Sequence, residues 1–107
     1  MKTVQLTIGH NVGSAPTFTT MEICGYVSQY LHVRGFTAFV CFGMWDGETE
    51  ESTRIEIAGL TDDESEKIRE LVPTLAQALN QQAIMFEVRA DRVEFIERET
   101  IAAIRTA

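Results

Sequence analysis

Residues 36–58 read FTAFVCFGMWDGETEESTRIEIA, and this stretch decides the fold class. Its first seven residues are nearly all apolar or aromatic, as expected of a strand that is covered on both faces. Residues 43–48 contain two glycines and two acids and predict a hairpin turn. Residues 52–58 then alternate apolar with charged side chains, which is typical of a return strand. The stretch therefore predicts two antiparallel strands joined directly to each other.

A strand and a helix are predicted on the N-terminal side of this hairpin. Apolar and polar residues alternate over 3–8, which indicates a half-buried strand. A glycine-containing loop follows, and a helix is expected to start near Thr19 or Thr20, either of which can cap it. We expect this helix to end at Gly35 in the left-handed position that follows a last helical turn.

A second helix and strand are predicted on the C-terminal side. Thr61-Asp62-Asp63-Glu64 has the pattern of a capping box, the clearest helix start in the sequence. Pro73 falls inside the apolar pattern that follows, so we expect a kink there or a helix broken in two. Residues 83–89 predict a strand that turns Ile84, Phe86 and Val88 to the core.

The predicted order is β-α-β-β-α-β, with a short strand near residues 93–96 and a short helix in the C-terminal tail. This is the ferredoxin-like arrangement of an α+β fold, an antiparallel sheet with both helices on one face. The 107 residues are expected to form a single domain. The predicted sheet has more apolar bulk than one layer of helices needs, because of Phe36, Phe39, Phe42, Met44 and Met85. This excess predicts a homo-oligomer (dimer or trimer) that buries the open face of the sheet.

The composition excludes some classes of partner. Sixteen acidic residues against nine basic ones give a net charge of −7, with no clustered basic patch, so direct nucleic-acid binding is not expected. The N-terminus has no apolar signal segment, and no apolar run approaches the roughly 20 residues of a membrane span. A cytoplasmic protein that does not bind membranes is therefore the expectation.

The loop after the first strand is one candidate site. Gly9 and Gly13 allow backbone amides to approach an anion, and the loop leads to a helix N-terminus. His10 and Asn11 are candidate ligand-binding residues at its rim. A simple connecting loop is the alternative, because the spacing is not that of a dinucleotide or P-loop motif.

The hairpin is the other candidate site. Its string GMWDGETEES, residues 43–52, resembles the hairpin of the CutA/PII-like superfamily in the positions of Trp45, Gly47, Glu50 and Glu51. That resemblance implies a ferredoxin-like domain that assembles as a trimer and binds small ligands or ions at the clefts between subunits.

The side chains of the hairpin suit a planar, polar ligand. Trp45 can stack on a ring, and Glu48 and Glu51 can accept hydrogen bonds from it. Ser52 and Arg54 of the return strand complete the set of ligand-binding candidates. A hydrophobic cap for Trp45 and a solvated acidic turn are the alternatives. No metal site and no cofactor are expected.

Three functions compete at this point. The first is a non-catalytic domain that senses or sequesters a nucleotide-like or other anionic metabolite at a subunit interface. The alternative is an acidic interaction or inhibitor module, such as a phage anti-defence protein, which requires the acids of 62–66 to join those of the hairpin on one face. The third is a small enzyme with His10 as proton carrier. Because no catalytic signature occurs, an enzyme is the less favoured expectation.

Overall fold

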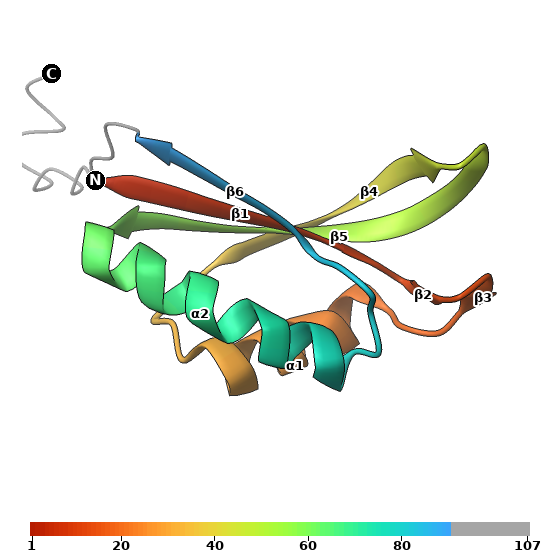
Figure 1. Cartoon of the computed structure of the whole chain (residues 1–107), viewed down its shortest axis with the longest axis horizontal. Coiled ribbons are helices and arrows are strands. Elements are labelled where there is room, and N and C mark those ends of the chain that lie inside the picture. Colours follow the sequence, from red (N-terminus) through yellow and green to blue (C-terminus); the bar gives the residue numbers. More distant parts are fainter. Residues whose placement is uncertain (91–107) are drawn as a thin grey trace, which may run out of the picture.

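The computed structural model describes residues 1–90, which form one sheet covered on one side by two helices (Figure 1). The sheet is antiparallel throughout, with strand order β4-β5-β1-β6. This order and the position of both helices confirm the predicted ferredoxin-like α+β arrangement. The strand predicted near 93–96 and the helix of the tail lie outside the described residues. The elements are β1 (Lys2–Gly9), β2 (Asn11–Val12), β3 (Ala15–Pro16), α1 (Thr20–Leu31), β4 (Thr37–Trp45), β5 (Glu48–Leu60), α2 (Asp62–Ala78) and β6 (Met85–Ala90).

The core lies between the sheet and the two helices. Alternate residues of β1 and β5 face it, because successive side chains of a strand point to opposite faces. Both helices contribute an apolar stripe at three- and four-residue spacing. The members are almost completely buried: Val4, Leu6, Ile8, Ile23, Val27, Leu31, Ile55, Ile57, Leu60, Ile68, Leu75 and Leu79.

Both helices begin as the sequence predicts. Thr19 caps α1, and Thr61 caps α2. In each case the threonine hydroxyl accepts a hydrogen bond from the third helical amide, and the glutamate there accepts one from the cap amide. Each capping box satisfies two donors that a helix N-terminus would otherwise leave without partners.

Two predictions about the helices need correction. α1 ends at Leu31, and the left-handed residue is His32 (φ 52°), not Gly35. His32 follows directly on Leu31, the last buried residue of the helix. α2 is not broken at Pro73 but continues through it, with Ile68 and Leu75 buried on either side of the proline, and a kink there stays a prediction.

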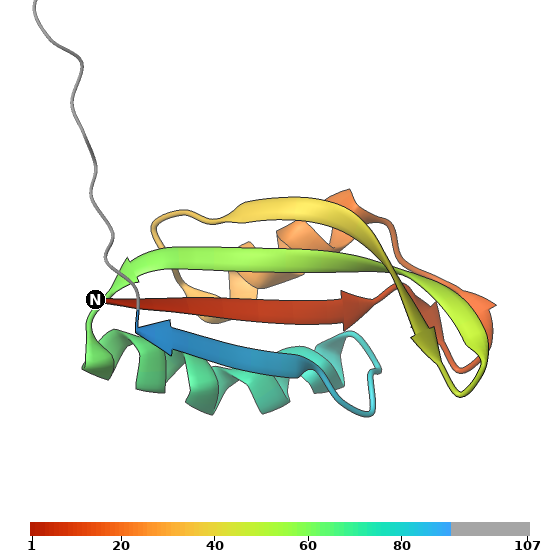
Figure 2. The same ribbon diagram turned by 90° about the horizontal axis from the view of Figure 1, so that it is seen from above.

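The β4–β5 hairpin is longer than predicted and projects beyond the helices as an arm (Figures 1 and 2). Its turn consists of Asp46 and Gly47 alone, both with positive φ (50° and 79°), as tight hairpin turns require. β5 therefore begins at Glu48 rather than at Ser52. The arm leaves Phe42 and Met44 exposed, because the helices do not reach them.

Candidate functional site

His10 directly follows the end of β1 and forms hydrogen bonds with several segments of the chain. Its Nε2 lies 2.7 Å from Thr53 Oγ1, which in turn lies 2.9 Å from Thr20 Oγ1. Its backbone carbonyl accepts hydrogen bonds from the amides of Thr17 and Phe18, and its amide donates to the Glu51 carbonyl. The side chain is only 5% exposed. His10 therefore joins the first loop, the start of α1 and β5 on the helix side of the sheet.

Glu50 and Gln81 hold the next residue of the loop. The Asn11 amide donates to Glu50 Oε2 at 3.0 Å, and its carbonyl accepts from Gln81 Nε2 at 2.8 Å. The carboxylate of Glu50 lies directly over Gly9, where a Cβ would come within 2.5 Å of Oε1. A side chain at this position would require the flexible end of Glu50 to move, because its carboxylate occupies that space.

These residues border a pocket of about 290 Å³. By register, its members from β1, β5 and β6 belong to the open face of the sheet, the face away from the helices. Its lining consists of Thr7, Gly9, Glu50, Gln81, Ala83, Ile84 and Met85. We call it the hairpin-end pocket. Glu50 is its only ionisable lining residue, so the pocket presents one negative charge.

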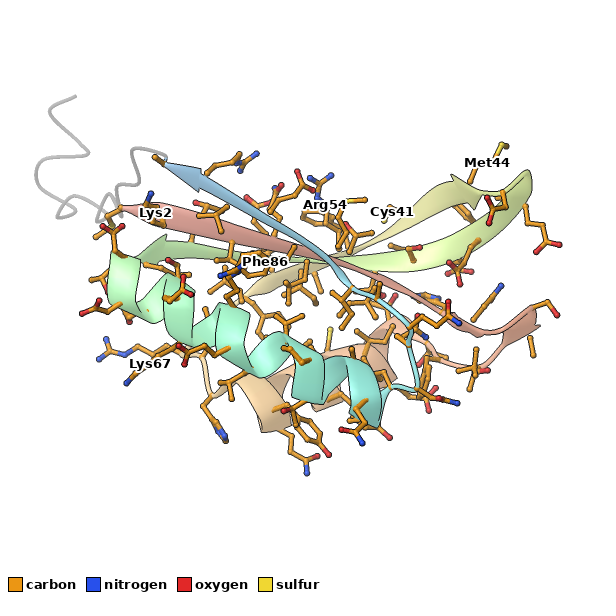
Figure 3. The ribbon with its side chains drawn as sticks, in the orientation of Figure 1. Lys2, Cys41, Met44, Arg54, Lys67 and Phe86 are labelled. Carbon is orange, nitrogen blue, oxygen red and sulfur yellow. The ribbon has the colours of Figure 1, made fainter. Side chains whose placement is uncertain are left out.

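A polar network runs along the same open face from this pocket. Arg54 Nη2 donates to Gln5 Oε1 at 2.6 Å and lies 3.7 Å from Glu87 Oε1. Figure 3 shows Arg54 on the side of the sheet opposite Phe86, which points to the helices. Two buried atoms of this face have no hydrogen-bond partner within residues 1–90, the Ser52 hydroxyl and Arg54 Nε. Buried polar groups without partners are costly and therefore uncommon in folded proteins.

The structure thus brings some predicted site residues together and separates others. His10, Asn11, Glu51, Ser52 and Arg54 lie at the base of the arm, although His10 and the open-face pair Ser52 and Arg54 are on opposite sides of the sheet. His10 Nδ1 lies 3.8 Å from Glu51 Oε1.

The other two candidates lie further along the arm. Trp45 and Glu48 pair with each other next to the turn, away from the hairpin-end pocket. The involvement of all seven candidates in ligand binding stays a prediction.

Sequence reasoning missed Gln5 and Thr53. Gln5 stands in the alternating pattern of β1 and is indistinguishable there from a solvent-facing residue, but it is only 4% exposed. Thr53 lies in the return strand, and no local pattern marks it as functional. Its hydroxyl pairs with His10, which is 43 positions away in the sequence. The one available signal was the strand parity, which places Gln5 and Arg54 on the same face.

Acidic residues of the hairpin and of α2 do not form one surface. The acidic first turn of α2 lies at the opposite end of the molecule from the hairpin tip (Figure 1). Within residues 1–90, no three His, Cys, Asp or Glu side chains form a group that could hold a metal ion. No helix in the same range is long and apolar enough to cross a membrane.

Comparisons with known proteins give matches among solved structures only. No family model matches the sequence, and no curated protein matches it significantly. Solved structures do match. A phage SAM lyase in complex with S-methyl-5′-thioadenosine superposes with a TM-score of 0.69 at 20% identity, over 82% of this chain and 79% of that one. A phage SAM lyase in the apo state gives 0.68 at 24% identity, over 82% and 78%.

These matches correct two expectations. These two solved structures are those of an enzyme, which contradicts the expectation of a non-catalytic binding domain and the preference against an enzyme. The matching chains are not CutA or PII proteins, and the resemblance to that superfamily stays untested. A small-molecule ligand, by contrast, agrees with the thioadenosine bound in the first neighbour.

Proposed function

We propose that this chain is an enzyme that cleaves S-adenosylmethionine (SAM) as a lyase and releases S-methyl-5′-thioadenosine. The observation that carries the proposal is the match to phage SAM lyase over about four fifths of both chains. The hairpin-end pocket supports it independently, because its one charge suits the positively charged sulfonium of SAM.

The chemistry of a sulfonium explains why no catalytic signature is present. When the bond between sulfur and Cγ of the methionine part breaks, its electron pair stays on sulfur and leaves a neutral thioether. This leaving group needs no proton, so no general acid is required. In the same step, either the carboxylate of the same molecule displaces the sulfur from Cγ and closes a lactone ring, or the proton on the adjacent carbon passes to a base, the Glu50 carboxylate or water, and a double bond forms. A motif search for acid–base pairs would therefore miss such an enzyme.

The open face offers a partner for two of the three charged parts of SAM, the sulfonium and the carboxylate. Glu50 faces the pocket and can attract the sulfonium. Arg54 lies further along β5 on the same face, with its Nε unpartnered, and can donate to the carboxylate. Oppositely charged groups at the two ends of a site orient a zwitterion and hold its reacting atoms in place. His10 is buried on the helix side, so we assign it the role of holding the first loop to β5.

The site is proposed to be completed by a second copy of the chain. A volume of 290 Å³ is at the lower limit of ordinary ligand pockets. Phe39 and Met85 flank the open-face network and are 41% and 45% exposed. Together with the Ser52 hydroxyl and Arg54 Nε, which have no hydrogen-bond partner within residues 1–90, they support the proposal that another subunit covers this surface.

The activity test is direct. The purified full chain is incubated with SAM, and S-methyl-5′-thioadenosine is quantified by liquid chromatography with mass spectrometry. S-adenosylhomocysteine, which lacks the positive sulfur, is the matched control and should remain intact. Proton NMR of the four-carbon product separates ring closure from elimination, because only elimination gives vinyl protons. A folded protein that yields no thioadenosine above the buffer background would refute the proposal.

The assembly test uses light scattering after gel filtration. Phe39→Asp places a charge on the open face and should convert the oligomer to monomer. Met21→Asp is the control, because Met21 is 79% exposed on α1, away from that face. A wild-type chain that runs as a monomer would exclude a site shared between subunits while leaving the activity test unaffected.

A further inference from the structure

A second and larger cavity lies at the other end of the molecule. It is a groove of about 1060 Å³ between the end of α1, the start of β4, the end of β5 and the first half of α2. We call it the helix-end groove. It shares no lining residue with the hairpin-end pocket.

The apolar part of the groove is formed by core residues. Ile57, Leu60 and Ile68 line it and are 2%, 7% and 3% exposed. Phe36 and Leu71, which are partly buried, extend this lining. An apolar ligand segment in the groove would therefore contact the edge of the hydrophobic core.

The charges of the groove are unusual for this acidic chain. Residues 1–90 contain six lysines and arginines, and four of them take part in ion pairs: Lys2, Arg54, Arg69 and Arg89. The remaining two, Arg34 and Lys67, have no hydrogen bond or ion pair within the described residues, and both line the helix-end groove. Figure 3 shows Lys67 on the side of α2 away from the sheet.

The carboxylate in the groove does not neutralise both cations. Glu64 is held by Thr61 in the capping box, with the Thr61 amide 3.0 Å from Oε1. Hydrogen bonds from Thr61 lower the pKa of Glu64, and the charges of Arg34 and Lys67 lower it further. Two cations against one fixed carboxylate leave a net positive charge over an apolar lining.

We propose that the helix-end groove binds an organic anion with an apolar body, such as a medium-chain carboxylate or an aromatic acid. The apolar body would lie against the partly buried Phe36 and Leu71, and the anionic group would pair with Arg34 and Lys67. A sulfonium cation does not suit this charge, so the groove is a second site. The inference does not rest on the proposed lyase activity.

Binding of decanoate to the full-length chain, measured by isothermal titration calorimetry, tests the proposal. Decyltrimethylammonium has the same chain length and the opposite charge, and it should bind at least about tenfold more weakly. In the nitrogen–proton NMR spectrum, decanoate should shift the amide signals of Gly35 and Gly59, which line the groove. Shifts confined to the hairpin-end pocket would overturn the proposal, and so would equal affinity for the two probes.

A double variant locates the anionic contact. Arg34→Gln with Lys67→Gln should weaken decanoate binding about tenfold or more, because two charge-assisted contacts are lost. Arg69→Gln is the matched control, since Arg69 lies on the same helix, pairs with Glu66 and does not line the groove. Unchanged affinity in the double variant would refute the assignment. Should that variant not fold, the comparison of the two probes on the wild-type chain decides alone.

Discussion

The two ends of this molecule differ in which charge is left for a ligand. At the hairpin end, Arg54 donates a hydrogen bond to Gln5 and forms an ion pair with Glu87. The charged group that lines the pocket there is the carboxylate of Glu50. At the helix end, Glu64 accepts hydrogen bonds in a capping box, and Arg34 and Lys67 form no hydrogen bond or ion pair within residues 1–90. The lesson is that a net charge of −7 does not predict the charge of each site, because internal pairing decides which groups stay available.

Of the substitutions considered, Glu50→Gln should have the largest effect, and it should affect the hairpin end alone. Removing the charge opposite the sulfonium is expected to lower kcat/KM for SAM cleavage about 100-fold, in the range found when one preorganised electrostatic contact is lost. Decanoate binding at the helix-end groove should not change. Asp46→Asn is the control, since Asp46 is an exposed acid in the hairpin turn and is not among the ligand-binding candidates. Equal loss of activity in both variants would show that only the overall acidity of the arm matters.

Thr53→Val should destabilise the fold by about 2 kcal/mol. The change keeps the shape of a completely buried side chain but leaves His10 and the Thr20 hydroxyl without their shared partner. Urea unfolding followed by circular dichroism gives the free energy of unfolding. Thr53→Ser keeps the hydroxyl and should be nearer to wild type. If valine and serine were equally destabilising, packing rather than hydrogen bonding would be the cause.

Gly9→Ala should separate activity from stability. A methyl group at this position would displace the flexible carboxylate of Glu50 from the Asn11 amide without straining the backbone. We expect SAM cleavage to fall about tenfold, which corresponds to about 1.4 kcal/mol, with a loss of stability below about 1 kcal/mol. Kinetics and thermal melting of the same preparation measure both. Full activity in this variant would mean that the position of the carboxylate is unimportant.

Thr61→Ala should have the smallest effect, about 1 kcal/mol of stability, because a helix cap is lost at the helix end. The effect should depend on pH. Folding lowers the pKa of Glu64 from its ordinary value of 4.5, so its stabilising contribution is present above that value and is lost as the pH falls through the lower, folded value. The difference between wild type and Thr61→Ala should therefore shrink in acid. A difference independent of pH would show that Glu64 plays no part.

Local signals in the sequence predicted the fold well. The alternation in β1 and β5 and the two capping boxes depend on residues close together in the chain, and the structure confirms them. The end of α1 and the length of the hairpin were predicted less well. Both depend on where helices cover the sheet, which is a property of the packed molecule.

The candidate site could be predicted only in part. The sequence pointed to residues that the structure places at the base of the arm, and their role in ligand binding stays a prediction. The separation of His10 from Arg54 by the sheet follows from register and not from spacing. Lack of a catalytic motif led to the preference against an enzyme, which the matches to an enzyme contradict. In the reaction that we propose, a positively charged sulfur would leave without help from a protein acid, so such a motif is not required. The helix-end groove escaped notice because Arg34 and Lys67 are unremarkable surface residues until the pairing of the other cations is known.

The contact between Gly9 and the carboxylate of Glu50 also has an evolutionary consequence. A lineage that gains a side chain at the first position must move or shorten the acid at the second, so the two sites should change together across homologues. Such a joint pattern survives when overall similarity has faded, because it follows from the space that the two residues share. Searching distant sequences for a glycine at the end of the first strand with a glutamate in the following hairpin would therefore gather relatives that average similarity misses.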